Sequence, residues 1–301
     1  MKLHILGCYA ATPSSTTNPT AQVLNIKNHL FLIDCGEGTQ VALRKAKIKF
    51  SRINHIFISH LHGDHFFGLP GLVSSFRLLG RERELHVYGP KGLKEAITLL
   101  LKLGDSWTNY PLRFHELSER EPQLIFEDEK VTVTTIPLDH RIYTNGFLFR
   151  EKPGERGLNY EMAVERGVHQ ADFQNLKNGR NVVLEDGSTV LNHEVTFDPP
   201  KPKSYAYCSD TGYHPPIIDQ ITGVDALYHE STFLQSEAHL AQKTKHATAE
   251  QAAQIAKASQ VGRLILGHYS TRYKSLEGFK EEAKPVFENV MLADDGIVFE
   301  L

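Results

Sequence analysis

The stretch INHIFISHLHGDH at residues 53–65 decides the fold and points to the chemistry. Its first half is a continuous apolar run with the length and composition of a buried β-strand. Its second half places three imidazoles and a carboxylate within six residues, and Gly63 permits the tight turn that would aim them at one place. Four potential ligands directly after a hydrophobic strand favour a metal site over a solvated polar turn, because imidazole suits Zn²⁺ and related ions.

One ion could take all four ligands, but the adjacent side chains of Asp64 and His65 diverge. We therefore expect His60 and His62 to serve one metal, and Asp64 and His65 to serve a second. Each metal then needs partners from elsewhere in the chain. Three further residues with suitable side chains leave the ends of apolar strands in the same way: His140, Asp210 and His268. Taken singly, each would be an ordinary loop residue, but together they complete the set of ligands that two metal ions would need.

The pattern around this stretch predicts a layered α/β domain. Strands are expected at 1–7, 21–28, 29–34, 53–59, 84–89, 111–117, 130–138, 144–151, 203–210, 224–230, 262–268 and 296–301. Helices are expected at 39–46, 68–80, 92–104, 247–259 and 275–287. Runs of strands without helices, around 1–34 and 111–150, indicate sheets that are partly antiparallel. We predict two sheets packed face to face with helices outside.

Residues 151–202 break this pattern. The segment is polar, rich in glycine and charge, and poor in hydrophobic periodicity. It is typical of an excursion from the core, which could be a long functional loop, an arm or a disordered insert.

The amino-acid composition limits the class of protein to which the chain can belong. The chain has 301 residues, 41% hydrophobic and 23% charged, which fits a soluble globular protein. No apolar run is long enough to span a bilayer, and residues 1–15 read as a short strand and loop, a poor secretory signal. Three scattered cysteines predict a reducing, cytoplasmic location. The net charge of −3 excludes a generally basic nucleic-acid binder, whereas 16 histidines invite a metal site.

Seven motifs together resemble the metallo-β-lactamase fold family, and within it the ribonuclease Z branch. They span nearly the whole chain: LIDCGEGTQ at 32–40, ISHLHGDHFFGLPGL at 58–72, PLDH at 137–140, SDT at 209–211, HESTF at 229–233, KHATAEQAA at 245–253 and LILGHYSTRY at 264–273. The HxHxDH core marks the superfamily, while FFGLPGL, DCGEGTQ and HESTF narrow the resemblance to ribonuclease Z.

The resemblance implies one four-layer αββα sandwich across residues 1–301, with 151–202 as an inserted flexible arm that binds tRNA. It implies two Zn²⁺ per chain, with Mn²⁺ as a substitute. One zinc would take His60, His62 and His140, and the other Asp64, His65 and His268, with Asp210 as the bridge. Asp34 matches a family position and would hold the histidine loop by hydrogen bonds.

The implied activity is that of a zinc-dependent endoribonuclease that removes 3′ trailers from tRNA precursors, acting as a homodimer and without a membrane. Physical reasoning reaches phosphodiester hydrolysis independently, because two zinc ions and two carboxylates leave a positive site for phosphate and acidify a shared water to an attacking hydroxide. Asp64 is the family's proton acceptor. Glu230 and His246 match the pair that the family assigns to protonation of the leaving 3′-oxygen.

Two segments depart from the family pattern. Residues 12–18, TPSSTTN, keep the Pro and Asn of a Pro-x-Lys-x-Arg-Asn loop but lack both cations, and the arm keeps the LKNG turn at 176–179 but lacks a Gly-Pro stretch. The alternative is therefore a general metal-dependent phosphodiesterase acting on small or cyclic esters. A catalytically silent RNA- or metal-binding module is disfavoured, because every expected ligand position is filled.

RNA binding needs a local basic surface rather than a basic total. Two groups of cations are candidates: Lys152, Arg156, Arg166, Lys177 and Arg180 on the arm, and Arg44, Lys45, Lys47 and Lys49 as a second cluster. The second group is more typical of a solvated helix face. Cys35 and Cys208 lie near strand ends and are expected to be small buried side chains rather than ligands.

Overall fold

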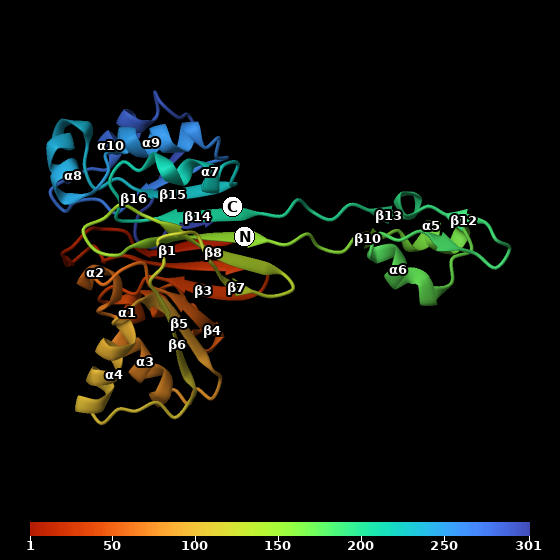
Figure 1. Ribbon diagram of the computed structural model, residues 1–301, viewed down its shortest axis with the longest axis horizontal. Coiled ribbons are helices and arrows are strands. Elements are labelled where there is room, and N and C mark those ends of the chain that lie inside the picture. Colours follow the sequence, from red (N-terminus) through yellow and green to blue (C-terminus); the bar gives the residue numbers. More distant parts are fainter. The chain divides into compact units, whose positions relative to one another are not determined.

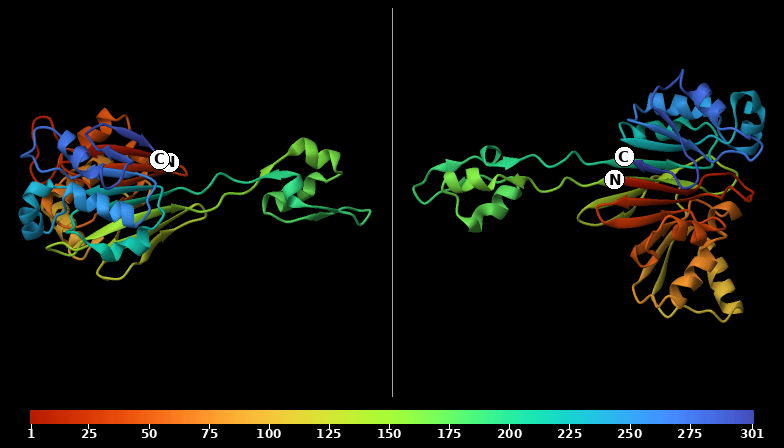
Figure 2. Two further views of the ribbon diagram at one scale, coloured as in Figure 1. Left: turned by 90° about the horizontal axis from the view of Figure 1, so that it is seen from above. Right: turned by 180° about the vertical axis from the view of Figure 1, so that it is seen from behind.

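Two seven-stranded sheets form the framework of the protein in a computed structural model that describes residues 1–301. The chain divides into two compact units, residues 1–150 with 203–301, and residues 151–202. The larger unit contains both sheets, and its first and last strands pair directly, with Lys2 opposite Glu300, so that the two chain ends lie side by side (Figure 2).

The N-terminal sheet runs, in spatial order, β18 (Val298–Glu300), β1 (Lys2–Gly7), β2 (Ala21–Ile26), β3 (His29–Ile33), β4 (Ile53–Phe57), β5 (Leu85–Pro90) and β6 (Leu112–Leu117). The C-terminal sheet runs β17 (Val290–Leu292), β16 (Leu264–Gly267), β15 (Ala226–Glu230), β14 (Ser204–Cys208), β9 (Asn145–Glu151), β8 (Val131–Pro137) and β7 (Leu124–Glu127). Strands β3 to β6 are parallel, as are β14 to β17, while the hairpin-connected strands pair antiparallel. The predicted mixture of parallel and antiparallel strands is confirmed.

Helices cover the outer face of each sheet, as Figure 1 shows for the larger unit. The N-terminal sheet carries α1 (Thr39–Lys45), α2 (Gly63–Phe66), α3 (Leu69–Leu78) and α4 (Leu93–Leu103), with the short 3₁₀ turn η1 (Phe50–Arg52) before β4. The C-terminal sheet carries α7 (Ile218–Ile221), α8 (Ala238–Thr244), α9 (Ala249–Ala258) and α10 (Glu277–Ala283), with η4 (Pro215–Ile217) directly before α7 and η5 (Gln235–Glu237) directly before α8. This arrangement confirms the predicted four-layer αββα sandwich. None of these helices has the length and apolar character that crossing a bilayer requires.

Aromatic side chains fill the space between the sheets. Phe31 and Phe57 of the N-terminal sheet meet Phe149 and Phe147 of the other, with ring centroids 5.6 and 5.4 Å apart. On the outer side of the C-terminal sheet, α9 buries small alanines such as Ala252 and Ala256, which allow its backbone to approach the strands closely. A capping box between Thr248 and Gln251 starts this helix. The sheets are thus packed on each other through aromatic side chains, and the C-terminal sheet is packed on α9 through small ones.

Residues 151–202 form a unit with its own small core. Its elements are β10 (Gly157–Leu158) paired with β13 (Thr196–Phe197), β11 (Val182–Val183) paired with β12 (Thr189–Val190), α5 (Tyr160–Glu165), α6 (Phe173–Lys177), η2 (Gln170–Asp172) and η3 (Asn192–Glu194). The buried core consists of Ala163, Val168, Leu176, Val182, Val190 and Val195. These apolar residues are too scattered along the chain for periodicity to reveal them, which is why the sequence pattern indicated only a loop or arm.

Candidate metal centre

Four side chains converge at the C-terminal ends of the strands to form a first ligand group. His60 and His62 follow β4, His140 follows β8, and Asp210 follows β14. His62 Nδ1 lies 2.9 Å from His60 Nε2 and 3.2 Å from His140 Nε2. Asp210 Oδ2 lies 3.4 Å from His60 Nε2. Four ligand atoms within such distances could hold one divalent ion.

A second group lies beside the first and shares Asp210 with it. His65 Nε2 and His268 Nε2 lie 3.1 and 3.0 Å from Asp210 Oδ1, and 3.5 and 3.6 Å from Asp64 Oδ2. One oxygen of Asp210 thus faces each group, the geometry of a bridging carboxylate. The structure therefore brings all seven predicted ligands together in two adjacent groups.

The buried Nε2 atoms of His65 and His268 have no hydrogen-bond partner. Unpaired buried polar atoms are rare in folded proteins because their desolvation is not compensated. Both atoms lie 3.0 to 3.6 Å from carboxylate oxygens of Asp64 and Asp210 without hydrogen-bond geometry, and a cation held among these groups would satisfy all of them. This observation, together with the imidazole and carboxylate donors, fits a divalent metal ion.

Asp34 holds the histidine loop from behind. Its buried carboxylate accepts hydrogen bonds from the Ser59 backbone N–H at 2.7 Å, from the Ser59 hydroxyl at 2.8 Å and from the Tyr207 hydroxyl at 2.6 Å. It also lies 2.7 Å from His65 Nδ1, which leaves His65 Nε2 facing the centre. These contacts confirm the predicted role of Asp34.

Three residues of the centre adopt the left-handed backbone conformation that non-glycine residues usually avoid. The φ angles are +55° at Asp34, +51° at Asp210 and +59° at His268. Asp34 and His268 directly follow the buried strands β3 and β16, and Asp210 lies two residues after β14, so that a sharp turn at each strand end aims the side chain into the centre. Such strain costs on the order of 1 to 3 kcal/mol each and persists where the surrounding structure over-determines it.

Burial sets the protonation state of the first group. It lowers the pKa of His60 to about 4 and that of His140 to about 4, so both imidazoles are neutral at pH 7 and have lone pairs to donate. Burial would also lower the pKa of His65, but the carboxylates of Asp210, Asp64 and Asp34 raise it well above its usual value. The three carboxylates thus stabilise positive charge at His65, and a divalent cation bound there can supply that charge in place of a proton.

Next to the ligands lies a buried acid–imidazole pair. Glu230, at the end of β15, places Oε1 2.7 Å from His246 Nδ1 and 2.8 Å from the Thr211 N–H. Its other oxygen accepts from the Thr232 hydroxyl at 2.6 Å. Burial alone would lower the pKa of His246, but the Glu230 carboxylate raises it to about 9. His246 is therefore a protonated imidazole at neutral pH, and its ring lies 5.0 Å from that of His140 and 5.5 Å from that of His268.

A cavity of about 490 Å³ opens over the centre. The loop at residues 10–13 forms one wall, and the Ala11 backbone N–H donates to Asp64 Oδ2 at 2.8 Å. His62, His246 and His268 also line this cavity. A substrate can therefore reach the centre through this cavity, although most of the side chains that could coordinate a metal are buried.

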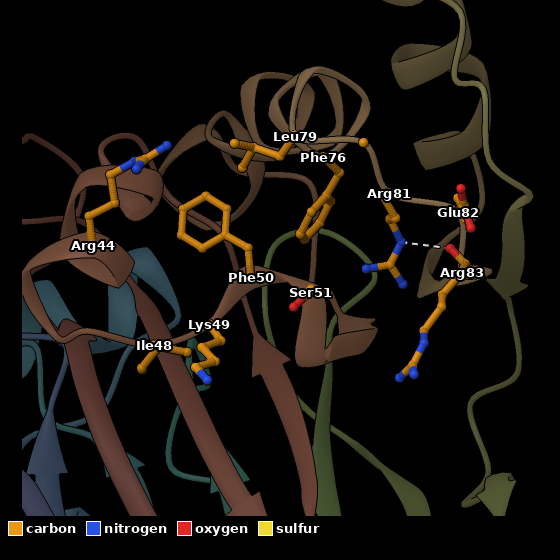
Figure 3. Close-up of a pocket in the computed structure, with 11 residues that line it drawn as sticks. Arg44, Ile48, Lys49, Phe50, Ser51, Phe76, Leu79, Arg81, Glu82 and Arg83 are labelled. Atoms are coloured by element: carbon orange, nitrogen blue, oxygen red, sulfur yellow. Dashed lines mark hydrogen bonds between the residues drawn. The ribbon is translucent and has the colours of Figure 1, made fainter.

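A second cavity, of about 530 Å³, contains part of the predicted basic cluster (Figure 3). Arg44 and Lys49 line it, with Phe50 and Phe76 as apolar walls. It adjoins η1, which precedes β4, and so lies at the opposite end of that strand from the histidine loop. The Arg81 guanidinium is occupied by backbone oxygens of Ile53, Arg83 and Glu84 and by the side chain of Asn54.

Several contributors were not foreseen from the sequence. Thr232 links Glu230, His246 and His268, since its hydroxyl lies 2.9 Å from His268 Nδ1 and 3.2 Å from His246 Nδ1. The backbone carbonyl of Lys245 orients His140 at 2.8 Å. The motif HESTF contained Thr232, but only the pairing of β15 with β16 brings it to His268. All three cysteines are buried and unpaired, as expected for Cys35 and Cys208.

Comparison with known proteins agrees with this geometry. The structure superposes on the metallo-β-lactamase fold protein YhfI from Bacillus subtilis with a TM-score of 0.70, covering 99% of both chains at 19% identity. It superposes on human tRNase Z, short form, with a TM-score of 0.74, covering 100% of this chain and 99% of that chain at 28% identity. The family model described as anti-Pycsar protein Apyc1 matches residues 1–289, and the chain falls within that family.

A curated relative from Bacteroides fragilis (strain YCH46), named Ribonuclease Z, is 46% identical over 300 residues, which is 100% of this chain and 99% of the relative. The chain belongs to the ribonuclease Z family. Its fold is accordingly of the metallo-β-lactamase type, and the expected enzyme class, a metal-dependent hydrolase of the ribonuclease Z type, is confirmed. The predicted ligands of this ribonuclease Z member occupy the His/Asp cluster that could hold a metal.

Proposed function

We propose that this ribonuclease Z family member is a zinc-dependent endoribonuclease that removes 3′ trailers from tRNA precursors in the cytoplasm. The observation that carries the proposal is the pair of ligand groups joined by Asp210, with the orphaned Nε2 atoms of His65 and His268 facing it. The names of its relatives, Ribonuclease Z and human tRNase Z, support RNA as the substrate class.

His60, His62 and His140 would hold one Zn²⁺, and Asp64, His65 and His268 the other, with Asp210 shared; Mn²⁺ is the expected substitute. Two divalent ions held there would supply Lewis acidity that draws charge from the phosphodiester and acidifies the attacking water. His140 and His60 contribute as neutral imidazoles, because burial keeps their pKa near 4.

Asp64 and His246 are the proposed proton acceptor and donor. Burial would raise the pKa of Asp64, but neighbouring His65 and His268 hold it well below its usual value, so its carboxylate is ionised. Its proposed role as proton acceptor rests on its place among the ligands, at the wall of the cavity, and not on its basicity. His246 is protonated because of Glu230 and lies on the cavity wall. From there it would give its proton to the leaving 3′-oxygen.

The unit at 151–202 is proposed to bind the tRNA body. Within it, Arg156 pairs with Asp198, and Arg166 lies 3.6 Å from Glu194, so their charges are largely compensated. Lys177 and Arg180 form no ion pair and become the preferred phosphate contacts of this unit.

A homodimer is part of the same proposal. Large apolar side chains are exposed on the outer helices α3 and α4 and just after α4: Leu78, Leu79, Leu99, Leu100, Leu103 and Trp107. Exposed apolar side chains gathered on a protein surface often mark an interface with another protein, and we assign this one to a second copy of the chain. Analytical ultracentrifugation checks it, and a monomer at micromolar concentration would contradict it.

A precursor cleavage assay with end mapping tests the function. Purified protein loaded with Zn²⁺ or Mn²⁺ should cut a trailer-bearing tRNA precursor at the 3′ end of the tRNA, and a chelator should abolish the cut. Cleavage that is insensitive to chelation, or no cleavage near the discriminator base, would contradict the proposal.

The second candidate is a general metal-dependent phosphodiesterase acting on small or cyclic esters. It is favoured by the loop at residues 12–18, which borders the cavity and contains no lysine or arginine. Hydrolysis of bis-p-nitrophenyl phosphate and of cyclic nucleotides without any preference for tRNA would support this candidate against the first.

A further inference from the structure

The cavity over the metal centre contains a single guanidinium and no lysine. Its lining includes the acidic residues Glu37, Asp64 and Asp210, and Arg141 is its only lysine or arginine. The loop at 12–18 contributes none. Apart from His246 and the metal centre itself, Arg141 is therefore the one permanently positive side chain in this cavity that a polyanion could bind.

Arg141 is free to act on a ligand. It directly follows His140, its side chain is exposed, and it forms no ion pair or hydrogen bond. The neighbouring acid, Asp139, is already engaged by Lys245 Nζ at 2.8 Å.

Arg141 also lies where two cavities meet. A neighbouring cavity of about 280 Å³, beyond His140, is lined by Arg120, Tyr143, His214 and again Arg141. A chain of nucleotides that passes through the centre has to leave it on one side or the other. At the junction beside His140, its next phosphate would come within reach of the Arg141 side chain.

The basic cavity of Figure 3 is a weaker candidate for such a contact, although it contains more cations. The guanidinium of Arg81 already donates hydrogen bonds to backbone oxygens of the protein. The guanidinium carbon of Arg44 lies 5.2 Å from the centroid of the Phe50 ring. The cavity also lies at the far end of β4 from the histidine loop.

We propose that Arg141 binds the backbone phosphate next to the scissile phosphodiester, and so provides the phosphate subsite that the cation-free loop at 12–18 does not. This inference rests on the proposed function, in that the substrate is an RNA strand. A guanidinium suits the task because its planar fork can donate two hydrogen bonds to one phosphate.

The test compares Arg141→Gln, Arg141→Lys and the distant, exposed control Arg83→Gln in the metal-loaded enzyme. KM and kcat for a trailer-bearing tRNA precursor are measured over a range of salt concentrations. For Arg141→Gln we expect KM to rise by about 10-fold, the scale of one missing charge-assisted hydrogen bond. The slope of log(kcat/KM) against log[salt] should become shallower by about 0.7, the value for one phosphate contact on a single strand.

The controls separate phosphate binding from other roles. Arg141→Lys should keep the wild-type salt slope because it keeps the charge, with only part of the KM increase, and Arg83→Gln should match the wild type. The loss of activity in Arg141→Gln should be larger on RNA than on bis-p-nitrophenyl phosphate, which has no second phosphate. Melting temperatures confirm that each variant is folded.

An unchanged salt slope in Arg141→Gln, or an equal loss of activity on both substrates, would overturn the inference while the wild type still cleaves RNA. If the wild type hydrolyses only the small diester, the proposed function fails and the inference fails with it. The two failures are thus distinguishable in one experiment.

Discussion

The metal centre takes its residues from both sheets, whereas the unit at residues 151–202 is built from one continuous segment. Asp34 and His268 are more than two hundred residues apart in the chain, yet both serve the same centre: Asp34 holds His65, and His65 Nε2 and His268 Nε2 lie 3.1 and 3.0 Å from Asp210 Oδ1. The smaller unit instead has a core of six buried apolar residues and pairs its charges locally, as Arg156 does with Asp198. The centre should therefore respond to substitution as one cooperative group, while the unit should be removable without loss of chemistry.

The largest expected effect comes from Asp64→Ala. The substitution removes a proposed ligand and the proposed proton acceptor together, so cleavage of the tRNA precursor should fall by about 10⁴-fold, the scale seen when one member of a catalytic group is removed. Single-turnover cleavage measures it, and Glu129→Ala, an exposed acid in the turn before β8, is the control. Retained activity in a folded Asp64→Ala protein would contradict the role assigned to this carboxylate.

Removal of residues 152–202 should have the next largest effect, and on RNA alone. Arg150 and Ser204 are direct neighbours in the β9–β14 pair, so an Asn-Gly turn can close the gap between the two strands. Because the proposed phosphate-binding cations of the smaller unit are deleted with it, kcat/KM for the precursor should fall on the order of 100-fold. Hydrolysis of bis-p-nitrophenyl phosphate should persist, since no residue of the centre lies in the segment. Loss of both activities in a folded variant would show that the two regions are not separable.

Glu230→Gln should change the pH dependence of the centre. The carboxylate raises the pKa of His246 to about 9, so the proposed acid stays protonated at neutral pH and is lost only as the pH rises through that value. Without the carboxylate, the pKa should return toward the ordinary histidine value near 6.5, which leaves roughly 30-fold less protonated imidazole at pH 8. The measurement is the pH profile of kcat, whose alkaline limb should move to lower pH. An unmoved limb would assign the proton donor to another group, and bound cations would shift both profiles downward together.

More of the metal centre than of the smaller unit could be predicted from the sequence. The strand before His60 is largely apolar and the ligands lie at strand ends, so the ligand set could be inferred from elements such as β4, β8, β14 and β16 without knowing their pairing. Thr232, Tyr207 and the Lys245 carbonyl could not be foreseen, because their roles depend on which strands are neighbours and on backbone turns at positive φ. In the smaller unit, Val168, Leu176 and Val190 form a core whose members follow neither a helical nor a strand period.

Leu176→Ala should have the smallest effect, because it perturbs only the core of the smaller unit. Leu176 is fully buried in the core of the smaller unit and belongs to the predicted LKNG turn. Its truncation should destabilise that unit by about 2 to 5 kcal/mol, the range for leucine cavities. Because the main core shares no residue with this cluster, the melting transition of the sandwich should remain in place. Hydrogen exchange resolved by peptide measures the two regions separately, and Leu148→Ala, in the core of the larger unit, is the matched control that should lower protection in the sandwich instead. If Leu176→Ala loosened the sandwich as well, the two cores would be coupled, and the independence that lets residues 152–202 be removed would disappear with it.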